Sequence, residues 1–442
     1  MTKYTPFWWE DQPQYKNNAD LPSDADVVVI GAGYTGLSAA LTLSRLGCSV
    51  VVLDSEDIGF GASTRNGGML GSGHKVSTSQ ARLRYGEEVA QRIHKETNSS
   101  ISFTKYLIKD NSIDCDLQEC GRLRTAWTPR DHIDMANNMN ELKSIKNFDS
   151  YIVDPEFMYK SINTSLYFGG QLYKEHGSVH PRKLHYGILQ LAISAGAQVF
   201  GGFRANRVEK LSNNLSQGFK VHVPEKFIKC QHVLIATNGY TRSDLSKYLS
   251  RRVLPVPSFI VTTEDIGTDM VNSLLPGGHC MVETRQRYCY YRATPCGKRI
   301  MLGTRAALHQ ISPQQALPKV INMLNGIFPS LAGVGISHCW TGLTGFSFSN
   351  LPAVGCSDGV YYALGYCGNG VAMAPYLGHK VALKMMHPDK EQSVFEKTTL
   401  STRFYYHGRP WFLPFASAIW RGHDIVDNYR QKNAQDKDQS RL

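Results

Sequence analysis

The sequence DVVVIGAGYTG at positions 26–36 decides the fold. Its first five residues form an apolar, β-branched run of the kind that makes a buried strand. A helix is predicted over residues 37–46, where Gly47 ends it, and a second buried strand over 49–53 ends at Asp54. A G-x-G-x-x-G pattern between strand and helix, with an acidic residue at the tip of the next strand, predicts a Rossmann-like unit that binds a dinucleotide.

Each glycine of this pattern has a separate physical task. Gly31 permits the tight turn, Gly33 lets the backbone approach a pyrophosphate, and Gly36 lets the helix pack on the strand. The helix N-terminus offers unpaired N–H groups and a partial positive charge to the phosphates, and Asp54 can accept hydrogen bonds from ribose hydroxyls. The expected contacts are Gly31, Ala32, Gly33, Tyr34, Thr35, Gly36, Asp54 and Ser55.

A small-residue loop, GFGASTRNGGM at 59–69, follows the acidic strand end and distinguishes between dinucleotides. Such a loop is rich in backbone N–H donors and can lie against a pyrophosphate and a flat ring system without steric conflict. The candidate contacts in it are Gly61, Ala62, Ser63, Thr64, Arg65, Asn66, Gly67, Gly68 and Met69.

The run GASTRNGGM resembles the G-A-S-x-R-N-G-G stretch of FAD-dependent oxidoreductases in the D-amino-acid oxidase superfamily, most of all the branch of γ-glutamylputrescine oxidase and similar amine or amino-acid oxidases. The resemblance extends from the aromatic lead-in FWW to about residue 380. The other segments that carry it are HPRKL at 180–184, NRVE at 206–209, VLIATNG at 233–239, YYRATP at 290–295, RIMLG at 299–303, WTG at 340–342, LPAVG at 351–355 and GYCGNGV at 365–371.

The resemblance implies that FAD is the cofactor, and that it is bound non-covalently because Cys339 is out of register with the cysteine that some relatives use. The last segment is predicted to lie between a strand at 359–364 and a helix at 371–386, whose N-terminus would face the flavin pyrimidine ring. The further cofactor contacts that it implies are Arg207, Val208, Thr237, Asn238, Gly239, Gly342, Gly365, Tyr366, Gly368, Asn369, Gly370 and Val371.

Several positions depart from the family pattern. Asp54 stands where most flavin relatives have Glu, Asn369 replaces the usual His, and Cys367 replaces the usual Ser. Val371-Ala372-Met373 stands where the sarcosine-oxidase branch has a Lys that holds the substrate carboxylate, which disfavours a simple N-methylglycine substrate.

The implied reaction is the oxidation of an amine or amino acid, such as a γ-glutamyl-polyamine-like one, to an imine. A hydride would pass to flavin N5, and O₂ would be reduced to H₂O₂. The candidate catalytic residues are His74, Tyr288, Tyr290, Arg292 and Asn369, and Arg285 is a further candidate for holding a carboxylate. The alternatives are a flavin dehydrogenase that passes electrons to a quinone or carrier protein, and a flavin-binding module without catalysis.

The fold class predicted is α/β with mixed α+β character: a Rossmann-like FAD-binding domain and an interleaved substrate domain built on a mostly antiparallel sheet. The predicted organisation is an N-terminal lead-in at 1–24, an FAD-binding domain at 25–75, 175–245 and 340–390, a substrate domain at 76–174 and 246–339, a C-terminal wrap at 391–427 and a flexible tail at 428–442.

Composition limits the partners. The formal net charge of +11 comes from scattered basic residues without a Lys/Arg run, so nucleic-acid binding is not expected. No apolar run approaches the roughly 20 residues of a membrane span. The aromatic stretch 404–415 is interrupted by Pro410 and Pro414, which disfavours membrane-surface contact through one amphipathic helix. The ten cysteines contain no C-x-x-C pair, which indicates reduced thiols, no metal site and a cytoplasmic location. The oligomeric state is not determined by the sequence.

Overall fold

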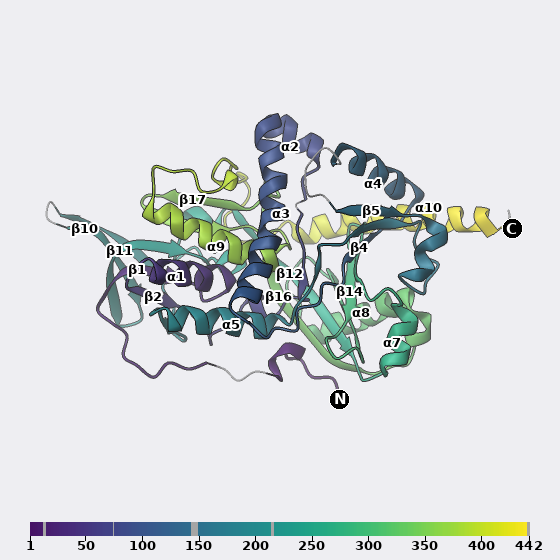
Figure 1. Ribbon diagram of the computed structural model, residues 1–442, viewed down its shortest axis with the longest axis horizontal. Helices are drawn as coiled ribbons and strands as arrows, with labels where there is room; N and C mark the ends of the chain where they lie inside the picture. Colours follow the sequence, from purple (N-terminus) through teal and green to yellow (C-terminus); the bar gives the residue numbers. More distant parts are fainter. Residues whose placement is uncertain (12–14, 74, 143–148, 214–215, 440–442) are drawn as a thin grey trace.

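A computed structural model describes residues 1–11, 15–73, 75–142, 149–213 and 216–439 of the chain (Figure 1). Within these residues there are two eight-stranded sheets and a two-stranded sheet. Helices cover both large sheets, and the long helix α3 (Glu87–Asp110) stands between the two halves in Figure 1. This mixed architecture is the fold class that the sequence predicts.

The first sheet has a parallel centre with antiparallel strands at its margins. Its central path is β17 (Ala353–Ser357), β18 (Val360–Leu364), β11 (Lys226–Ile235), β1 (Asp24–Ile30), β2 (Val50–Leu53) and β8 (Gln198–Phe200), and the antiparallel strands β10 (Ser216–Val223) and β9 (Arg207–Asn213) extend from β11. The pairs β18–β11, β11–β1, β1–β2 and β2–β8 are parallel, as βαβ connections require.

Three helices pack on one face of this sheet because each presents a continuous apolar stripe. They are α1 (Tyr34–Arg45), α5 (Pro181–Ser194) and α9 (Gly370–Met386). The sequence places α1 and α9 within a few residues of these bounds. Gly36 of α1 lies so close to the carbonyl oxygen of Gly31 that a Cβ there would collide with it, which is the helix–strand packing role expected of the third glycine.

The second sheet is antiparallel except for one pair. Its order is β16 (Ile336–Ser347), β12 (Val253–Thr263), β15 (Ile300–Thr304), β14 (Cys289–Ala293), β13 (Cys280–Glu283), β4 (Arg122–Thr125), β6 (Gly170–Tyr173) and β5 (Ser150–Val153), with only β13 and β4 parallel. The helices α7 (Thr268–Leu274) and α8 (Pro313–Ile327) share a core with one face of this sheet. The short helices α4 (Pro129–Leu142) and α6 (Lys247–Ser250) lie outside that core.

Two segments pack differently from the predicted grouping. The helices α2 (Thr78–Tyr85) and α3 begin the stretch 76–174, yet their apolar residues join the core formed by α1 and α9. Strand β16 runs through residue 347 as the edge of the second sheet, although the sequence prediction assigns residues from 340 onward to the FAD-binding domain, which contains the first sheet. In both cases the partner is distant in sequence, and local patterns do not reveal it.

The aromatic lead-in packs onto the body of the protein. Phe7–Trp9 form one 3₁₀ turn, and the Trp8 side chain is fully buried. Trp8 Nε1 donates to the Asn66 carbonyl at 2.8 Å, and Trp9 Nε1 donates to Thr64 Oγ1 at 2.9 Å. The short strand β3 (Met69–Leu70) follows this loop and pairs with β7 (Gly177–Ser178). The lead-in therefore braces the 59–69 loop from outside.

The C-terminal helix α10 (Leu413–Gln439) includes part of the segment that the sequence predicts as a tail from residue 428. Its middle part contacts loops next to the second sheet: Trp127 Nε1 donates to Asn428 Oδ1, and Gln431 Nε2 donates to the Leu166 carbonyl. Pro414 lies in the first turn of the helix, where its missing N–H costs no hydrogen bond, so it does not break the helix. Within the described residues, no helix is both long and apolar enough to span a bilayer.

Candidate active site

The first cavity is a cleft at the carboxyl ends of the parallel strands β1, β2 and β11, with a volume of about 210 Å³. Ligands of open α/β sheets bind at this edge. We call it the nucleotide cleft. The following residues, which the sequence predicts as cofactor contacts, line this cleft: Gly31, Ala32, Gly33, Tyr34, Thr35, Asp54, Ser55, Gly61, Ala62, Ser63, Asn66, Thr237, Asn238, Tyr366, Gly368, Gly370 and Val371.

The N-terminus of α1 forms the phosphate end of the cleft. Gly33 is its N-cap and makes no side-chain cap, while the Tyr34 N–H donates to Ser63 Oγ at 2.9 Å. Asp54 accepts from the Ala32 N–H at 2.8 Å and from the Glu56 N–H at 3.2 Å. Burial raises the pKa of Asp54, and these hydrogen bonds oppose the rise.

The backbone of the cleft fits the dinucleotide that the family implies. Gly31 has φ +107°, and a Cβ there would lie 3.0 Å from the Ala236 carbonyl oxygen. A Cβ on Gly33 would lie 2.9 Å from Ser63 Oγ. Side chains at either position would therefore fill the cradle that a pyrophosphate needs, so this chain can hold ADP at the α1 N-terminus.

A second helix N-terminus, that of α9, closes the other end of the cleft. Gly370 and Val371 line it, and the N-cap residue Asn369 makes no side-chain cap. Tyr366 Oη lies 2.6 Å from Thr35 Oγ1 of α1, and Asn238 Oδ1 accepts from the Gly365 N–H at 2.9 Å. Strand ends and helices from both ends of the chain thus meet around one cleft.

The second cavity is a chamber of about 1310 Å³, lined by strands of the second sheet and by the loops that precede α2 and α9. It shares a wall with the nucleotide cleft, formed by Ala62, Asn66, Leu343, Thr344, Gly368 and Val371. The predicted residues Arg65, Gly67, Met69, Gly342 and Asn369 also line the chamber. A flat ring at this shared wall would meet the nucleotide on one side and a substrate on the other.

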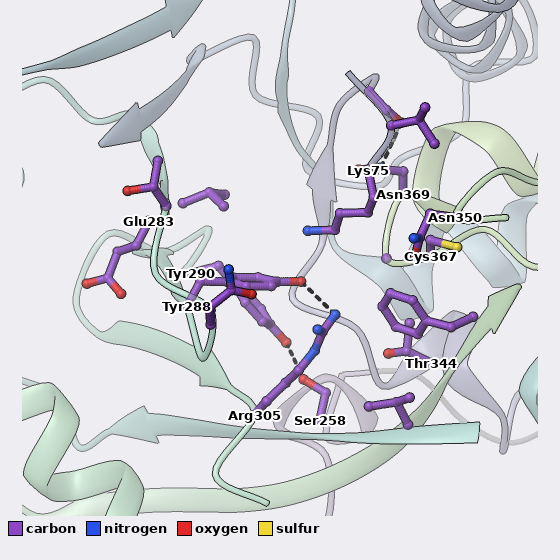
Figure 2. Close-up of a pocket in the computed structure, with 18 of the residues that line it drawn as sticks. Lys75, Ser258, Glu283, Tyr288, Tyr290, Arg305, Thr344, Asn350, Cys367 and Asn369 are labelled. Atoms are coloured by element: carbon purple, nitrogen blue, oxygen red, sulfur yellow. Dashed lines mark hydrogen bonds between the residues drawn. The ribbon is translucent and has the colours of Figure 1, made fainter. Parts of the chain in front are cut away.

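Tyr288 lies between two cations in the chamber (Figure 2). Arg305 Nη2 donates to Tyr288 Oη at 3.1 Å, and Lys75 Nζ lies 4.4 Å from the centroid of the Tyr288 ring. Figure 2 shows Lys75 reaching in from the loop after β3, while Arg305 comes from the end of β15. We call these three residues the Tyr288 cluster.

Charge sets the ionisation of this cluster. Burial raises the pKa of Tyr288, but Arg305 and Lys75 outweigh burial and lower it to about 8. The Lys75 side chain is accessible from the chamber, but the surrounding protein displaces bulk water from it. This desolvation lowers the pKa of Lys75. At neutral pH, below the pKa of Tyr288, the cluster therefore holds a neutral phenol beside the guanidinium of Arg305, and it carries positive charge.

The remaining predicted catalytic residues occupy different places. Tyr290 shares the chamber face with Tyr288, as strand alternation predicts, and its Oη lies 3.0 Å from Ser258 Oγ. Asn369 Nδ2 donates to the Gly73 carbonyl at 2.7 Å. Arg292 does not line the chamber; it is buried, stacks over the Trp8 ring and donates to the Val179 carbonyl. His74 lies outside the described residues.

Arg285, the other predicted carboxylate holder, is already paired. It lines the chamber, but it forms a short ion pair with the buried carboxylate of Glu283 and stacks over the Trp127 ring at 4.0 Å. Its guanidinium is therefore engaged within the protein.

The adenine end differs from the sequence prediction. Arg207 and Val208 lie in strand β9 and do not line the cleft, and Arg207 pairs with Glu209. The segment Phe203–Ala205, just before that strand, lines the cleft instead. The loop after β8 turns back over the cleft, because the Phe203 N–H donates to the Asp54 carbonyl at 2.8 Å. This contact is not visible in a local pattern.

Some predicted residues shape the site without lining it: Gly36, Thr64, Gly68, Gly239 and Gly365. Sequence reasoning missed several lining residues, chiefly Lys75, Arg305, Thr344, Tyr240 and Phe203. A lysine six residues after the loop's Met69 is the only local signal among them, since a cation there follows a cofactor loop directly. Cys339 is buried in the second core and lines neither cavity, whereas Cys367 lines the chamber.

Comparison with known proteins agrees with this geometry. The family model described as FAD dependent oxidoreductase matches residues 26–383. The chain belongs to this family. Its cofactor is accordingly FAD. The curated relatives of this oxidoreductase include gamma-glutamylputrescine oxidoreductase of Escherichia coli (strain K12), which is 28% identical over 368 residues, 83% of this chain and 84% of the relative.

Solved structures share the fold of this FAD-dependent oxidoreductase. Glycine oxidase from Geobacillus kaustophilus superposes with a TM-score of 0.68 at 18% identity and covers 87% of this chain and 100% of its own. L-proline dehydrogenase from P. horikoshii also gives 0.68, at 19% identity, covering 85% of this chain and 96% of its own.

Proposed function

We propose that this FAD-dependent oxidoreductase oxidises the C–N bond of an amine or amino acid that also carries a carboxylate. The observation that carries the proposal is the Tyr288 cluster, which places Arg305 and Lys75 in a chamber that shares a wall with the nucleotide cleft. Bound FAD supplies the two-electron oxidation, and the chain supplies binding, orientation and electrostatics.

The charge balance of the chamber supports an anionic group on the substrate. Its basic lining residues are Arg65, Lys75, Arg122, Arg124, Arg285, Arg305 and Arg403, and its acidic ones are Asp131, Asp134 and Glu283. Glu283 is neutralised by Arg285. An arginine binds a carboxylate through two parallel N–H···O bonds, so Arg305 is suited to anchor that end of the substrate, with Lys75 as a second charge.

The size of the chamber supports a substrate longer than a small amino acid. At about 1310 Å³ it exceeds the range of roughly 300–1,000 Å³ that accommodates most small ligands. The E. coli relative is named for gamma-glutamylputrescine, a long amine with a carboxylate at its far end. We therefore propose a γ-glutamyl-polyamine-like substrate, with its carboxylate at the Tyr288 cluster and its amine at the shared wall.

Positioning is the main contribution of the protein to the rate. Holding the reacting carbon against the shared wall makes the reaction unimolecular, and the walls formed by Leu343 and Val371 exclude water there. The amine reacts in its neutral form, so no paired carboxylates are required. We propose that the product is an imine and that O₂ accepts the electrons to give H₂O₂, in line with the oxidase resemblance of the motifs.

The compartment is part of the proposal. All ten cysteines are free, which supports a reducing compartment, and we propose the cytoplasm.

A matched pair of substrates tests the proposal. Putrescine and γ-glutamylputrescine present the same primary amine, and only the second carries a carboxylate. The holoenzyme is mixed anaerobically with each, and bleaching of the flavin absorbance is recorded. We expect bleaching with γ-glutamylputrescine at a concentration at least tenfold lower than with putrescine, and the gap should close in Arg305→Met. Equal response to both amines in the wild type would refute the carboxylate anchor.

The acceptor is measured separately. Admitting air to the bleached enzyme should restore the flavin and yield one H₂O₂ per substrate oxidised. Restoration by a quinone analogue but not by air would favour the dehydrogenase alternative. If neither these amines nor a wider panel of amines and amino acids bleaches the flavin, the chain is a binding module.

A further inference from the structure

Two cysteines meet behind the chamber wall, away from both cavities. Cys120 lies two residues before β4, and Cys280 is the first residue of β13, the strand parallel to β4. Their sulfur atoms are 3.9 Å apart. Cys120 is half-buried and Cys280 is buried, so one thiol is reachable from solvent and the other is not. Nothing in the proposed oxidation of an amine uses this pair.

The Cys120 sulfur lies beside a thiol and close to a positive charge. Its contact with the Cys280 thiol and the charge of Arg292 lower the pKa of Cys120 to about 6 against the opposing effect of burial. The same contact with Cys120 raises the pKa of Cys280. The proton of the pair is therefore held by the buried sulfur, and the reachable sulfur carries the charge.

A buried cation faces this charge. Arg292 is 2% exposed, and its Nη2 donates a hydrogen bond to the Val179 carbonyl at 2.8 Å. Among the described residues, its Nε and Nη1 atoms have no hydrogen-bond partner. Burying an unpaired guanidinium costs several kcal/mol, at an order of magnitude, unless an anion lies nearby. A Cys120 thiolate supplies negative charge near Arg292, in addition to the Asp116 carboxylate, and raises the pKa of Arg292 against the effect of burial, while Arg292 lowers the pKa of Cys120.

We propose that Cys120 and Cys280 form a peroxide-oxidisable dithiol, with Cys120 as the attacking thiolate and Cys280 as the resolving thiol. The Cys120 thiolate attacks one oxygen of H₂O₂, the O–O bond breaks, and with one proton the products are a sulfenic acid and water. The Cys280 thiol then attacks that sulfur, a second water leaves, and an S–S bond forms. Two thiols are oxidised and one peroxide is reduced.

The two sulfur atoms are close enough for the disulfide bond to form in the second step. The sulfur atoms must move from 3.9 Å to the bonded distance of about 2.05 Å, which side-chain rotation can provide. Oxidation also removes the anion beside Arg292. Arg292 contacts Val179 and the backbone at Gly68, which belongs to the 59–69 loop, so the oxidised protein should hold FAD less tightly. The dithiol would thereby couple peroxide to cofactor retention.

The test uses the holoenzyme with added H₂O₂ and no amine, so it does not depend on the substrate or acceptor proposed above. After treatment, free thiols are alkylated and the peptides mapped by mass spectrometry. We expect a Cys120–Cys280 disulfide to form while the exposed Cys356 stays reduced. Burial raises the pKa of Cys356, which makes it a matched control for exposure without activation.

The pH dependence and two variants give independent readouts. The alkylation rate of Cys120 should level off above pH 7, whereas that of Cys356 should still rise about tenfold per unit up to pH 8. In Cys280→Ser, peroxide should leave a sulfenic acid at Cys120 that dimedone captures, and in Cys120→Ser, Cys280 should stay reduced. Oxidation of Cys356 before Cys120, a Cys120 profile that still rises at pH 8, or a disulfide to any other cysteine would each overturn the proposal.

Discussion

Replacing Arg305 with Met should change the ionisation of Tyr288 and the affinity for the substrate together. Met keeps much of the volume of the side chain but removes the guanidinium that donates to Tyr288 Oη at 3.1 Å. The pKa of Tyr288, about 8 in the protein against an ordinary value of 10.0, reflects two cations that outweigh burial. Of the two, Arg305 has the larger Coulombic effect, so without it the pKa should rise toward 10.

The magnitude follows from that shift. Two pKa units at 1.36 kcal/mol each correspond to about 2.7 kcal/mol of net preference for the phenolate. The sign is that of an acid whose folded pKa is depressed: the stability it contributes is absent below about pH 8, grows between 8 and 10, and is complete above 10. For the substrate, loss of charged hydrogen bonds worth about 1.5–3 kcal/mol should raise KM roughly 10- to 150-fold.

The assay is a titration of phenolate absorbance between pH 6 and 10 on the holoenzyme. The wild type should show one tyrosine of its 22 titrating near pH 8. That step should vanish in Tyr288→Phe, move up by about two units in Arg305→Met, and remain in Tyr290→Phe, since burial raises the pKa of Tyr290. The reasoning is refuted if the Arg305→Met step stays near pH 8.

The same ionisation sets the pH dependence of binding. Above pH 8 the phenolate neutralises one positive charge of the cluster, so KM for a carboxylate-bearing substrate should rise with pH while kcat changes little. In Tyr288→Phe this rise should be absent. A rise of equal size in that variant would assign it to another group.

Three further substitutions test cofactor retention and the stability of the fold. Gly33→Val should abolish FAD retention by filling the pyrophosphate cradle, whereas Gly326→Ala, with open space around it, should not; flavin content per protein after gel filtration decides this. Trp8→Ala should cost about 3–5 kcal/mol in denaturant unfolding, and Trp411→Ala, 60% exposed, under about 1; equal costs would contradict the bracing role. Burial lowers the pKa of His185 to about 4 from 6.5, so unfolding free energy should fall by up to about 3.4 kcal/mol as pH drops from 6.5 to 4, and this part should disappear in His185→Gln.

The local signals in the sequence were enough to predict both glycine turns. Residues 26–54 and 360–386 each contain an apolar strand, a glycine turn and an apolar helix in direct succession, and the structure confirms them within a few residues. Such units are decided by neighbours in the chain. The alternation of Tyr288 and Tyr290 on one face was predictable for the same reason.

Residues that meet only through tertiary contacts were not predictable. Lys75 and Arg305 are separated by about half of the chain and come together because β3 and β15 end at the same chamber. Arg292 follows the strand period onto the chamber side, but Trp8 and the 59–69 loop cover it. The second half of α10 is polar, and its contacts with Trp127 and Leu166 help to hold it as a docked helix.

The bracing of the flavin-side loop by the first ten residues bears on how the protein is assembled. Lys3 pairs with Ser337 and Cys339 of the second sheet, while Trp8 and Trp9 reach the loop of the first. A ribosome releases residues 337–339 only after most of the chain has been made, so the amino-terminal segment must wait for its docking strand. The chain should therefore bind FAD, and turn yellow, only late in its synthesis. A bulky amino-terminal fusion should delay or prevent this binding.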